Sequence, residues 1–367
     1  MGKKVVVGLS GGVDSGVSAL LLKQAGYEVI GVHLYCWPPK GEEKPEGCRA
    51  DEDRKSALKT ALELKIPFKI LDFSEEYKTR VVDYFYREYE AGRTPNPDVL
   101  CNSEIKFGLF LDWALKNGFD YVATGHYARL TEIKTKTDTN NICLCIPCDK
   151  HKDQTYFLWK LTQKELKHVL FPLGDYLKKE VREMAKKANL SVADRKDSQG
   201  ICFVGNVDVQ EFLRRRLKEK SGEVVDVKGK VIGAHKGVWF YTIGQRHGFS
   251  ADGLGGSFKH ARPPLYVVEK DAKKNRLVVG FGVETYKDSF VVGEVNWISE
   301  SGLEVGKVLK VRIRHGRELI PCKLIGDRVE LEEPQRGVAA GQSAVFYVSR
   351  EAKGEVGWEC LGGGVIE

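Results

Sequence analysis

Hydrophobic and polar positions follow two alternating periodicities along roughly the first 125 residues. Short apolar runs are followed by segments whose apolar residues recur every three or four positions, as on one face of a helix. The pattern predicts strands at residues 3–7, 28–34, 68–73 and 121–124, and helices at 14–24, 50–64, 74–90 and 102–117. This strand–helix alternation is typical of a parallel, doubly wound α/β sheet with helices on both faces.

The pattern changes past about residue 205. Helices are still expected at 176–188 and 208–220, but glycines and short β-branched segments then dominate. Strands are expected at 224–227, 266–268, 277–279, 290–295, 308–313, 328–332 and 344–348, with a hairpin turn at 271–275. The second part of the chain is therefore predicted to be mostly β, in two small modules.

Composition excludes several classes of protein. The 367 residues are 42% hydrophobic and 30% charged, which is ordinary for a globular chain and excludes disorder as the main state. No apolar run approaches the roughly 20 residues that a membrane helix needs, and the apolar stretch at the N-terminus is too short for a signal peptide. We expect a cytoplasmic protein with no membrane partner. The net charge of +7 permits an acidic partner such as a nucleic acid.

The segment Gly8–Ser15, with the sequence GLSGGVDS, lies between the first predicted strand and the first predicted helix. Gly11 and Gly12 allow a tight turn, so that backbone N–H groups and the helix N-terminus can surround one anion. Ser10 and Ser15 add hydroxyl donors. The segment lacks the lysine of a Walker A loop, which argues against cleavage of the γ-phosphate. The alternative is a helix-capping turn, but the position after the first strand favours phosphate binding.

Two of the nine cysteines stand in settings that favour chemistry. Cys101 is expected at the N-terminus of the 102–117 helix, where the helix dipole favours the thiolate, and Asp98 could shuttle a proton there. Cys202 follows a glycine in a polar turn and is expected to be accessible. Together they suggest sulfur chemistry in which one cysteine carries a persulfide and the other resolves it. A buried cysteine beside a capping aspartate is the alternative for Cys101.

Three other cysteines, Cys143, Cys145 and Cys148, have a spacing that could hold a metal. No histidine or second cysteine pair stands nearby, and the apolar residues of 142–146 alternate. A strand is therefore the favoured interpretation. The basic cluster Arg214–Arg216 offers partners for phosphate, although such a cluster is more often a solvated face.

The loop Ser-Gly-Gly-Val-Asp-Ser resembles the PP-loop of the ATP-pyrophosphatase superfamily, whose members cleave ATP between the α- and β-phosphates. The chain as a whole is similar to the bacterial tRNA-specific 2-thiouridylases. The resemblance is carried by GLSGGVDS, GRTPNPDVLCNSEIKFG, ATGHYAR, KDQTYFL, FPLG, KKEVREMA, KDSQGICFVG, FYTIGQRHG and GQSAVFY, in this order. The family usually has Lys-Asp-Gln-Ser-Tyr where this chain has Lys-Asp-Gln-Thr-Tyr, which keeps the hydroxyl.

The resemblance implies three domains: a PP-loop, adenine-nucleotide α-hydrolase-like catalytic domain over 1–205, a small, mostly β central domain over 206–282, and a tRNA-binding β-barrel over 283–367. It implies ATP with Mg²⁺, and no other metal, for adenylation of O2 of the wobble uridine in tRNAs for Lys, Glu and Gln. Persulfide sulfur then replaces that oxygen. A cysteine desulfurase or a sulfur-relay protein would supply the sulfur, and the chain is expected to be a monomer.

The resemblance also implies site residues. Cys101 and Cys202 are the catalytic cysteines, with a transient Cys101–Cys202 disulfide, and Asp98 joins them as a catalytic residue because of its position one turn before Cys101. The ATP site is formed by Gly8, Leu9, Ser10, Gly11, Gly12, Val13, Asp14, Ser15, Leu34 and Gly125. The tRNA contacts, of which the first three meet the target base, are Asn96, Pro97, Asp98, His126, Lys152, Asp153, Gln154, Arg314, His315 and Gln342.

Three alternatives stay open. Some relatives that thiolate RNA use an iron–sulfur cluster, which Cys101, Cys202 and a third cysteine such as Cys36 could hold; this is the less favoured arrangement. A PP-loop synthetase that transfers ammonia would need an ammonia source and would have no use for Cys202. A non-enzymatic RNA-binding or sulfur-carrier protein would not need the intact Ser10, Asp14 and Ser15.

Overall fold

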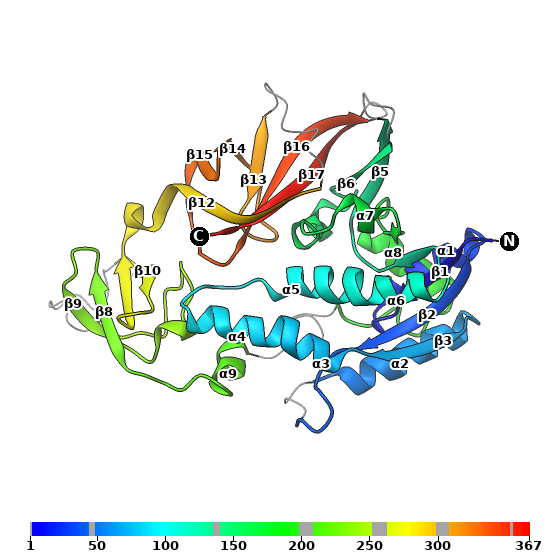
Figure 1. The fold of residues 1–367 in the computed structure, drawn as a ribbon, viewed down its shortest axis with the longest axis horizontal. Helices are drawn as coiled ribbons and strands as arrows, with labels where there is room; N and C mark the ends of the chain where they lie inside the picture. The colour runs from blue at the N-terminus through cyan, green and yellow to red at the C-terminus, as the bar shows by residue number, and fades with distance from the viewer. Residues whose placement is uncertain are drawn as a thin grey trace.

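The computed structural model describes residues 2–43, 48–134, 140–197, 208–251, 263–298, 308–352 and 355–367. These residues form three sheets. The parallel sheet with its helices, the small sheet of the middle of the chain, and the large C-terminal sheet occupy three separate regions of the molecule (Figure 1). Within these ranges, no helix is both long enough and apolar enough to cross a membrane.

The N-terminal sheet has the strand order β3-β2-β1-β4-β7, and all its pairings are parallel. Its strands are β1 (Lys4–Gly8), β2 (Glu28–Tyr35), β3 (Phe68–Asp72), β4 (Tyr121–Ala123) and β7 (Val169–Leu170). Val6 packs into one buried cluster, whereas Val5 and Val7 pack into another, so both faces of β1 are covered. The predicted doubly wound sheet is confirmed. Strand order reverses between β1 and β4, which is where such sheets bind ligands.

Most of the predicted helices are present within a few residues. They are α1 (Val13–Gln24), α2 (Ala50–Glu63), α3 (Ser74–Tyr77), α4 (Asp83–Glu90), α8 (Lys178–Lys187) and α9 (Val209–Arg214). The predicted helix 74–90 contains a π-helical stretch, Lys78–Val82, between α3 and α4. The helix predicted at 208–220 ends at Arg214, because the polar residues after it lead into the next strand.

The predicted start of the helix at residue 102 is wrong. The helix begins with α5 (Pro97–Leu100), continues as a π-helical segment (Cys101–Leu109) and ends with α6 (Phe110–Lys116). Proline fits the first helical position because that residue needs no N–H donor. Cys101 is therefore one turn inside the helix, and its N–H already bonds to the carbonyls of the preceding turn.

The middle of the chain forms a four-stranded sheet in the order β10-β11-β8-β9. Its strands are β8 (Gly222–Asp226), β9 (Val231–His235), β10 (Tyr266–Asp271) and β11 (Arg276–Gly280). The predicted hairpin turn at 271–275 is confirmed, since β10 and β11 are antiparallel and the Lys274 N–H donates to the Asp271 carboxylate over 3.0 Å.

Six strands of the C-terminal sheet close into a barrel in the order β12-β15-β14-β13-β16-β17, with β17 pairing back to β12. They are β12 (Tyr286–Trp297), β13 (Leu309–Arg312), β14 (Ile320–Ile325), β15 (Arg328–Arg336), β16 (Ser343–Ala352) and β17 (Glu355–Ile366). Neighbouring strands run antiparallel. The predicted C-terminal β-barrel is thus confirmed.

A hairpin from the first half of the chain extends this sheet. It consists of β5 (Arg129–Lys134) and β6 (Asn140–Cys145), and β6 pairs with β17 through Cys145 opposite Glu359 and Leu144 opposite Cys360 (Figure 1). The strand predicted around 142–146 is therefore present. The domain boundaries given above stay a prediction, and this pairing couples the first predicted domain to the last.

A buried ion pair joins the same two parts of the chain. Arg312 of β13 donates to Asp153 over 2.5 Å, and the two side chains are only 9% and 2% exposed. The other carboxylate oxygen of Asp153 accepts from the N–H and the hydroxyl of Thr155 at 2.9 and 2.7 Å. Asp153 is thus fully engaged inside the protein.

Replacing Arg312 by Met should lower the free energy of unfolding by about 3–5 kcal/mol, because it leaves the Asp153 carboxylate buried without its cation. Urea unfolding followed by tryptophan fluorescence measures the loss. The double variant Arg312→Met with Asp153→Asn, which leaves no unpaired charge, should lose clearly less. Equal losses in the single and double variants would show that the charge pair is not what stabilises this contact.

Candidate functional site

The predicted phosphate loop connects β1 to α1 at the point where the strand order reverses. The Ser10 N–H donates to the Ser15 hydroxyl over 3.2 Å, and the Gly12 N–H donates to the Ser10 hydroxyl over 3.3 Å. The Ser15 hydroxyl also donates to the Gly12 carbonyl over 3.1 Å. None of the described side chains caps α1, so N–H groups of its first turn can bind an anion. The loop thus has the donors that the predicted phosphate site requires.

Two glycines allow neighbouring backbone to approach this loop. Gly11 has a φ of +81°, and a Cβ there would lie 2.3 Å from the carbonyl oxygen of Asp53. A Cβ on Gly125, just after β4, would lie 2.7 Å from the backbone nitrogen of Ser15. Arg195 donates to the Gly11 carbonyl and to the Asp53 carboxylate, each over 2.5 Å. The loop is therefore held between α2, Arg195 and the end of β4.

Asp14, in the first turn of α1, is the centre of a charged network. Lys178, the first residue of α8, donates from Nζ to both Asp14 oxygens at 2.7 Å. The Tyr127 hydroxyl donates to Asp14 Oδ1 over 3.0 Å. Lys178 also lies 2.9 Å from Asp197, with its own side chain only 12% exposed. The Asp14 carboxylate thus holds the largely buried ammonium group of Lys178 beside the phosphate loop.

Asp197 continues the network towards a predicted RNA contact. It accepts from Arg182 over 2.6 Å and from Lys152 over 2.8 Å. Burial opposes ionisation of Asp197, but hydrogen bonds from Lys152 and Lys178 outweigh it and lower the pKa of the carboxyl to about 2. Asp197 therefore stays negative at neutral pH. Lys152, 40% exposed, lies at the outer end of the network.

The helix with the predicted catalytic residues lies over the same sheet. Asn96 is the N-cap residue of α5, Pro97 its first residue, and Asp98 is half-buried in its first turn. Cys101 is fully buried and belongs to the same apolar cluster as Leu34 at the end of β2. The structure thus brings Cys101 and Leu34, predicted for different roles, into one cluster.

Thr94, two residues before Asn96, is bound by three distant residues. Its N–H donates to the Ala340 carbonyl over 2.8 Å, and its carbonyl accepts from the Gln342 amide over 2.9 Å. Lys270 Nζ lies 3.5 Å from the Thr94 hydroxyl and donates to the Tyr241 carbonyl over 2.8 Å. The amide nitrogen of Gln342, a predicted tRNA contact, thus holds the loop before α5.

Two further predicted tRNA contacts have side chains bound to other parts of the protein, with His126 buried and Gln154 half-buried. His126 is 7% exposed, its Nδ1 lies 2.7 Å from the Thr124 hydroxyl, and its ring contacts Phe107 and Phe171. Burial holds the pKa of His126 well below its usual range, so the imidazole is neutral. Gln154 accepts from the Tyr127 N–H over 2.9 Å. The side chains of His126 and Gln154 thus shape the region around the phosphate loop.

Arg314 and His315 lie between β13 and β14. Arg314 donates to the Ile243 carbonyl over 3.1 Å, which connects the barrel to the middle of the chain. His315 is exposed, and its ring lies against Phe157 with centroids 4.4 Å apart. Of this pair, His315 is the one whose side chain faces solvent.

The described cysteines range from buried to exposed. Cys202 lies outside the described residues. The predicted Cys101–Cys202 disulfide therefore also lies outside them. Cys143 and Cys145 are buried on β6, and burial raises the pKa of both thiols, whereas Cys148 is exposed. Across the described ranges, no group of three or more His, Cys, Asp or Glu side chains could hold a metal ion.

Several residues that build the site have no role predicted from the sequence. They are Asp53, Tyr127, Lys178, Arg182, Arg195 and Asp197. Four of them, Tyr127, Lys178, Arg182 and Asp197, lie within the stretches ATGHYAR, KKEVREMA and KDSQGICFVG that carry the family resemblance. That resemblance was the available signal, because contacts between residues so far apart leave no local pattern.

Three family models match consecutive parts of the chain. Residues 3–206 match the tRNA methyl transferase HUP domain, 210–281 the tRNA methyl transferase PRC-barrel domain, and 287–366 the aminomethyltransferase beta-barrel domain. The tRNA-specific 2-thiouridylase MnmA of Limosilactobacillus fermentum is 45% identical over 99% of this chain and 95% of its own. That of Streptococcus thermophilus (strain ATCC BAA-491 / LMD-9) is 43% identical over the same shares.

Among solved structures, a 4-thiouridine synthetase–RNA complex with bound ATP is 19% identical. It covers 58% of this chain and 50% of that chain, with a TM-score of 0.33. At that TM-score the similarity supports no inference about function.

Lys270 generates a prediction about pH. Burial lowers the pKa of Lys270 to about 7, whereas an unfolded lysine keeps its proton up to about pH 10.4. Between these values the unfolded chain binds the extra proton, so Lys270 makes stability rise with pH, by at most about 1.4 kcal/mol per pH unit.

Urea unfolding from pH 6.5 to 9.5 should therefore show a steeper rise in the wild type than in Lys270→Met. Lys274→Met is the matched control, since Lys274 is 68% exposed in the turn after β10. Its pH profile should follow the wild type. Parallel profiles for wild type and Lys270→Met would contradict the shifted pKa.

Proposed function

Because this chain belongs to the tRNA-specific 2-thiouridylase family, we propose that it is an ATP-dependent tRNA sulfurtransferase that makes 2-thiouridine at the wobble position of tRNAs for Lys, Glu and Gln. One observation supports this most directly. The phosphate loop after β1 lies at the switch point of the sheet, and Leu34 at the end of β2 packs in one cluster with Cys101. Nucleotide activation and thiol chemistry would then be carried by the same parallel sheet and its helices.

The first step is adenylation of the base. The residues present fit a nucleotide phosphate, because the loop supplies uncapped N–H donors and two hydroxyls, and Gly11 and Gly125 leave no Cβ in the way. Mg²⁺ bound with ATP would neutralise part of the negative charge of the phosphates. Uracil O2 attacks the α-phosphate and pyrophosphate leaves, so that O2 becomes part of a good leaving group. Asp14 positions the Lys178 ammonium for the developing charge.

The second step is sulfur transfer. The terminal sulfur of a persulfide on Cys202 attacks C2 of the activated uracil, and AMP leaves. The Cys101 thiolate then attacks the Cys202 sulfur, which releases 2-thiouridine and forms a Cys101–Cys202 disulfide that an external thiol must reduce. Asp98, half-buried one turn before Cys101, accepts the thiol proton. Because Cys101 is fully buried, this order protects its thiol until Cys202 presents the sulfur.

The predicted RNA contacts then fall into two roles. Lys152 and His315, which reach solvent, contact tRNA directly. Asp153, His126 and Gln342 act by positioning, since their side chains are bound within the protein. We propose that the barrel and the loop before α5 together present the Asn96–Asp98 turn to the target base.

Asp14→Asn should lower tRNA-dependent pyrophosphate release by about 100-fold, because a neutral amide cannot hold the Lys178 ammonium at the loop. The affinity for tRNA should change by less than about twofold, since a charge inside the loop is not an RNA contact. Pyrophosphate release and filter binding of an unmodified tRNA transcript measure the two effects. Asp194→Asn is the control, because Asp194 is 85% exposed. Undiminished pyrophosphate release in Asp14→Asn would contradict the assignment of Gly8–Ser15 as the ATP-binding loop.

The two cysteines should separate the two steps. Cys202→Ser should still release pyrophosphate with tRNA and ATP but form no 2-thiouridine. Cys101→Ser should accept persulfide sulfur but stop before turnover. Mass spectrometry of the wobble nucleoside reads the product, with the exposed Cys148→Ser as a control that keeps full activity. Full thiolation by Cys202→Ser would overturn the assignment, and an absence of product from the wild type would overturn the proposed function.

A further inference from the structure

Four arginines, called here the junction arginines, lie where the middle sheet meets the barrel (Figure 1). Arg246 lies between β9 and β10, Arg314 and Arg317 lie between β13 and β14, and Arg336 ends β15. Arg314 is half-buried and the other three are exposed, and none of the four makes an ion pair with a residue that the structure describes. Arg246 belongs to FYTIGQRHG, a stretch that carries the family resemblance and has no role in the reaction proposed above.

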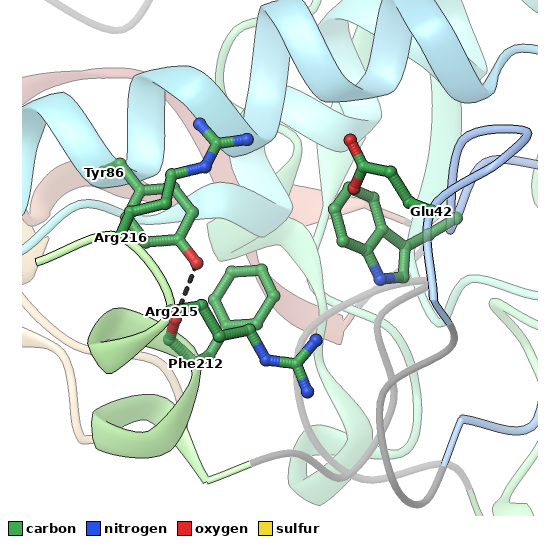
Figure 2. A pocket seen from close by; sticks show the side chains of 6 residues that line it. Glu42, Tyr86, Phe212, Arg215 and Arg216 are labelled. Carbon is green, nitrogen blue, oxygen red and sulfur yellow. Dashed lines mark hydrogen bonds between the residues drawn. The ribbon is translucent and has the colours of Figure 1, made fainter.

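The basic cluster Arg214–Arg216 at the end of α9 differs from the junction arginines. Arg214 pairs with Glu219 over 3.4 Å, and Arg216 pairs with Asp83. Figure 2 shows the side chains of Arg215 and Arg216 extending in different directions. Two of the three charges in this cluster are therefore neutralised, and the cluster is not a continuous cationic surface.

Contacts with the backbone bring the junction arginines together. Arg314 donates to the Ile243 carbonyl over 3.1 Å, three residues before Arg246. A Cβ on Gly337, the residue after Arg336, would lie 3.1 Å from Cζ of Arg314. Arg314 thus contacts both the segment that carries Arg246 and the segment that carries Arg336.

Arg336 is held in place by aromatic rings. Its guanidinium carbon lies 5.3 Å from the ring centroid of Tyr266 and 4.6 Å from that of Tyr286. The residue after Tyr266 donates from its N–H to the carbonyl of Gln245 over 2.9 Å, and Arg246 follows directly. Aromatic faces attract a guanidinium without cancelling its charge. Arg336 is therefore a fixed and charged side chain close to the backbone that carries Arg246.

The charge of Arg314 is opposed by its surroundings. Burial and, after it, the charge of Arg317 lower the pKa of Arg314. Arg317 also donates from its N–H to the Arg314 carbonyl over 3.4 Å. Because a guanidinium keeps its proton at neutral pH, the repulsion stays in the folded protein, and a bound anion would relieve it.

The junction arginines lie beside the turn that is proposed to meet the target base. Burial raises the pKa of the Tyr156 hydroxyl, whereas a side-chain hydrogen bond with Asn96 and the charge of Arg314 oppose that rise. Tyr156 is therefore next to both Asn96 and Arg314. An anion at the junction arginines would lie close to the Asn96–Asp98 turn.

We propose that the junction arginines bind the sugar–phosphate backbone of the tRNA, and that the middle sheet thereby takes part in holding the substrate. The inference rests on the proposed function for the identity of the RNA. It gives FYTIGQRHG two tasks, since this stretch carries Arg246 and supplies the carbonyl that fixes Arg314. Guanidinium groups fit phosphate because their N–H donors form a planar fork. Phosphate contacts position a nucleic acid without reading its sequence, so this surface holds different tRNAs alike.

The test is the salt dependence of tRNA binding by the full chain. Filter binding of an unmodified tRNA transcript between about 50 and 200 mM KCl gives the slope of the logarithm of the binding constant against that of the salt concentration. Arg246→Gln and Arg336→Gln should each make this slope shallower by about 0.7–0.9, because each removes one phosphate contact. Arg336→Lys, which keeps the charge but not the planar group over the two tyrosines, should keep the wild-type slope.

Two arginines that pair with carboxylates are the matched controls. Arg276 of the middle sheet lies 2.7 Å from Glu223, and Arg328, at the other end of β15 from Arg336, lies 3.8 Å from Glu330. Arg276→Gln and Arg328→Gln should keep the wild-type slope.

Two outcomes would overturn the proposal. One is a slope for Arg246→Gln and Arg336→Gln that equals the slope of the controls, since a purely structural loss weakens binding without changing the number of phosphate contacts. The other is a loss of ATP affinity in Arg246→Gln, which equilibrium dialysis should find changed by less than about twofold. Neither measurement needs thiolation. A chain that shows the expected slopes but makes no 2-thiouridine would therefore contradict the proposed function and support this inference.

Discussion

The backbone and side chain of one residue, Thr94, fix the position of the helix that carries Cys101. Its N–H and carbonyl are held by Ala340 and Gln342, next to the barrel strand β16, and its hydroxyl lies beside Lys270 of the middle sheet. These partners are at least 176 residues away along the chain. Since Asn96, Asp98 and Cys101 follow directly, their place over the parallel sheet is set by the rest of the chain, and not by the sheet alone.

The phosphate loop depends on a second set of distant contacts. Asp14 and Asp197 share Lys178 between them, and Asp197 also binds Lys152. The network therefore runs from the first turn of α1 to an exposed lysine and to the residue that precedes the Cys202 segment. A change of charge at the loop, such as the arrival of phosphates, acts on Lys178 first and through it on Asp197. The loop and the residue that precedes the Cys202 segment are thereby electrostatically connected.

Sequence patterns predicted the parallel sheet well, because each buried strand and its helix have a local signal. The predicted start of the helix carrying Cys101 was residue 102, which left out Pro97, although proline suits a first turn. Strand β17 was not predicted, because the glycines at 362–364 hide its alternation. The roles of Lys178 and Gln342 were out of reach, since their partners are 164 and 248 residues away. The resemblance to a family identified the neighbourhoods of these residues but not their contacts.

The pairing of β6 with β17 has a consequence for biosynthesis. The ribosome makes the β5–β6 hairpin more than 200 residues before it makes Glu359 and Cys360, the residues that pair with it. Until then the outer side of β6 is an unpaired strand edge, which is prone to associate with other chains. Contacts between segments so distant in sequence form late and slowly. A nascent chain stalled before residue 355 would therefore expose this edge, and the newly made protein is vulnerable to aggregation until its last strand is added.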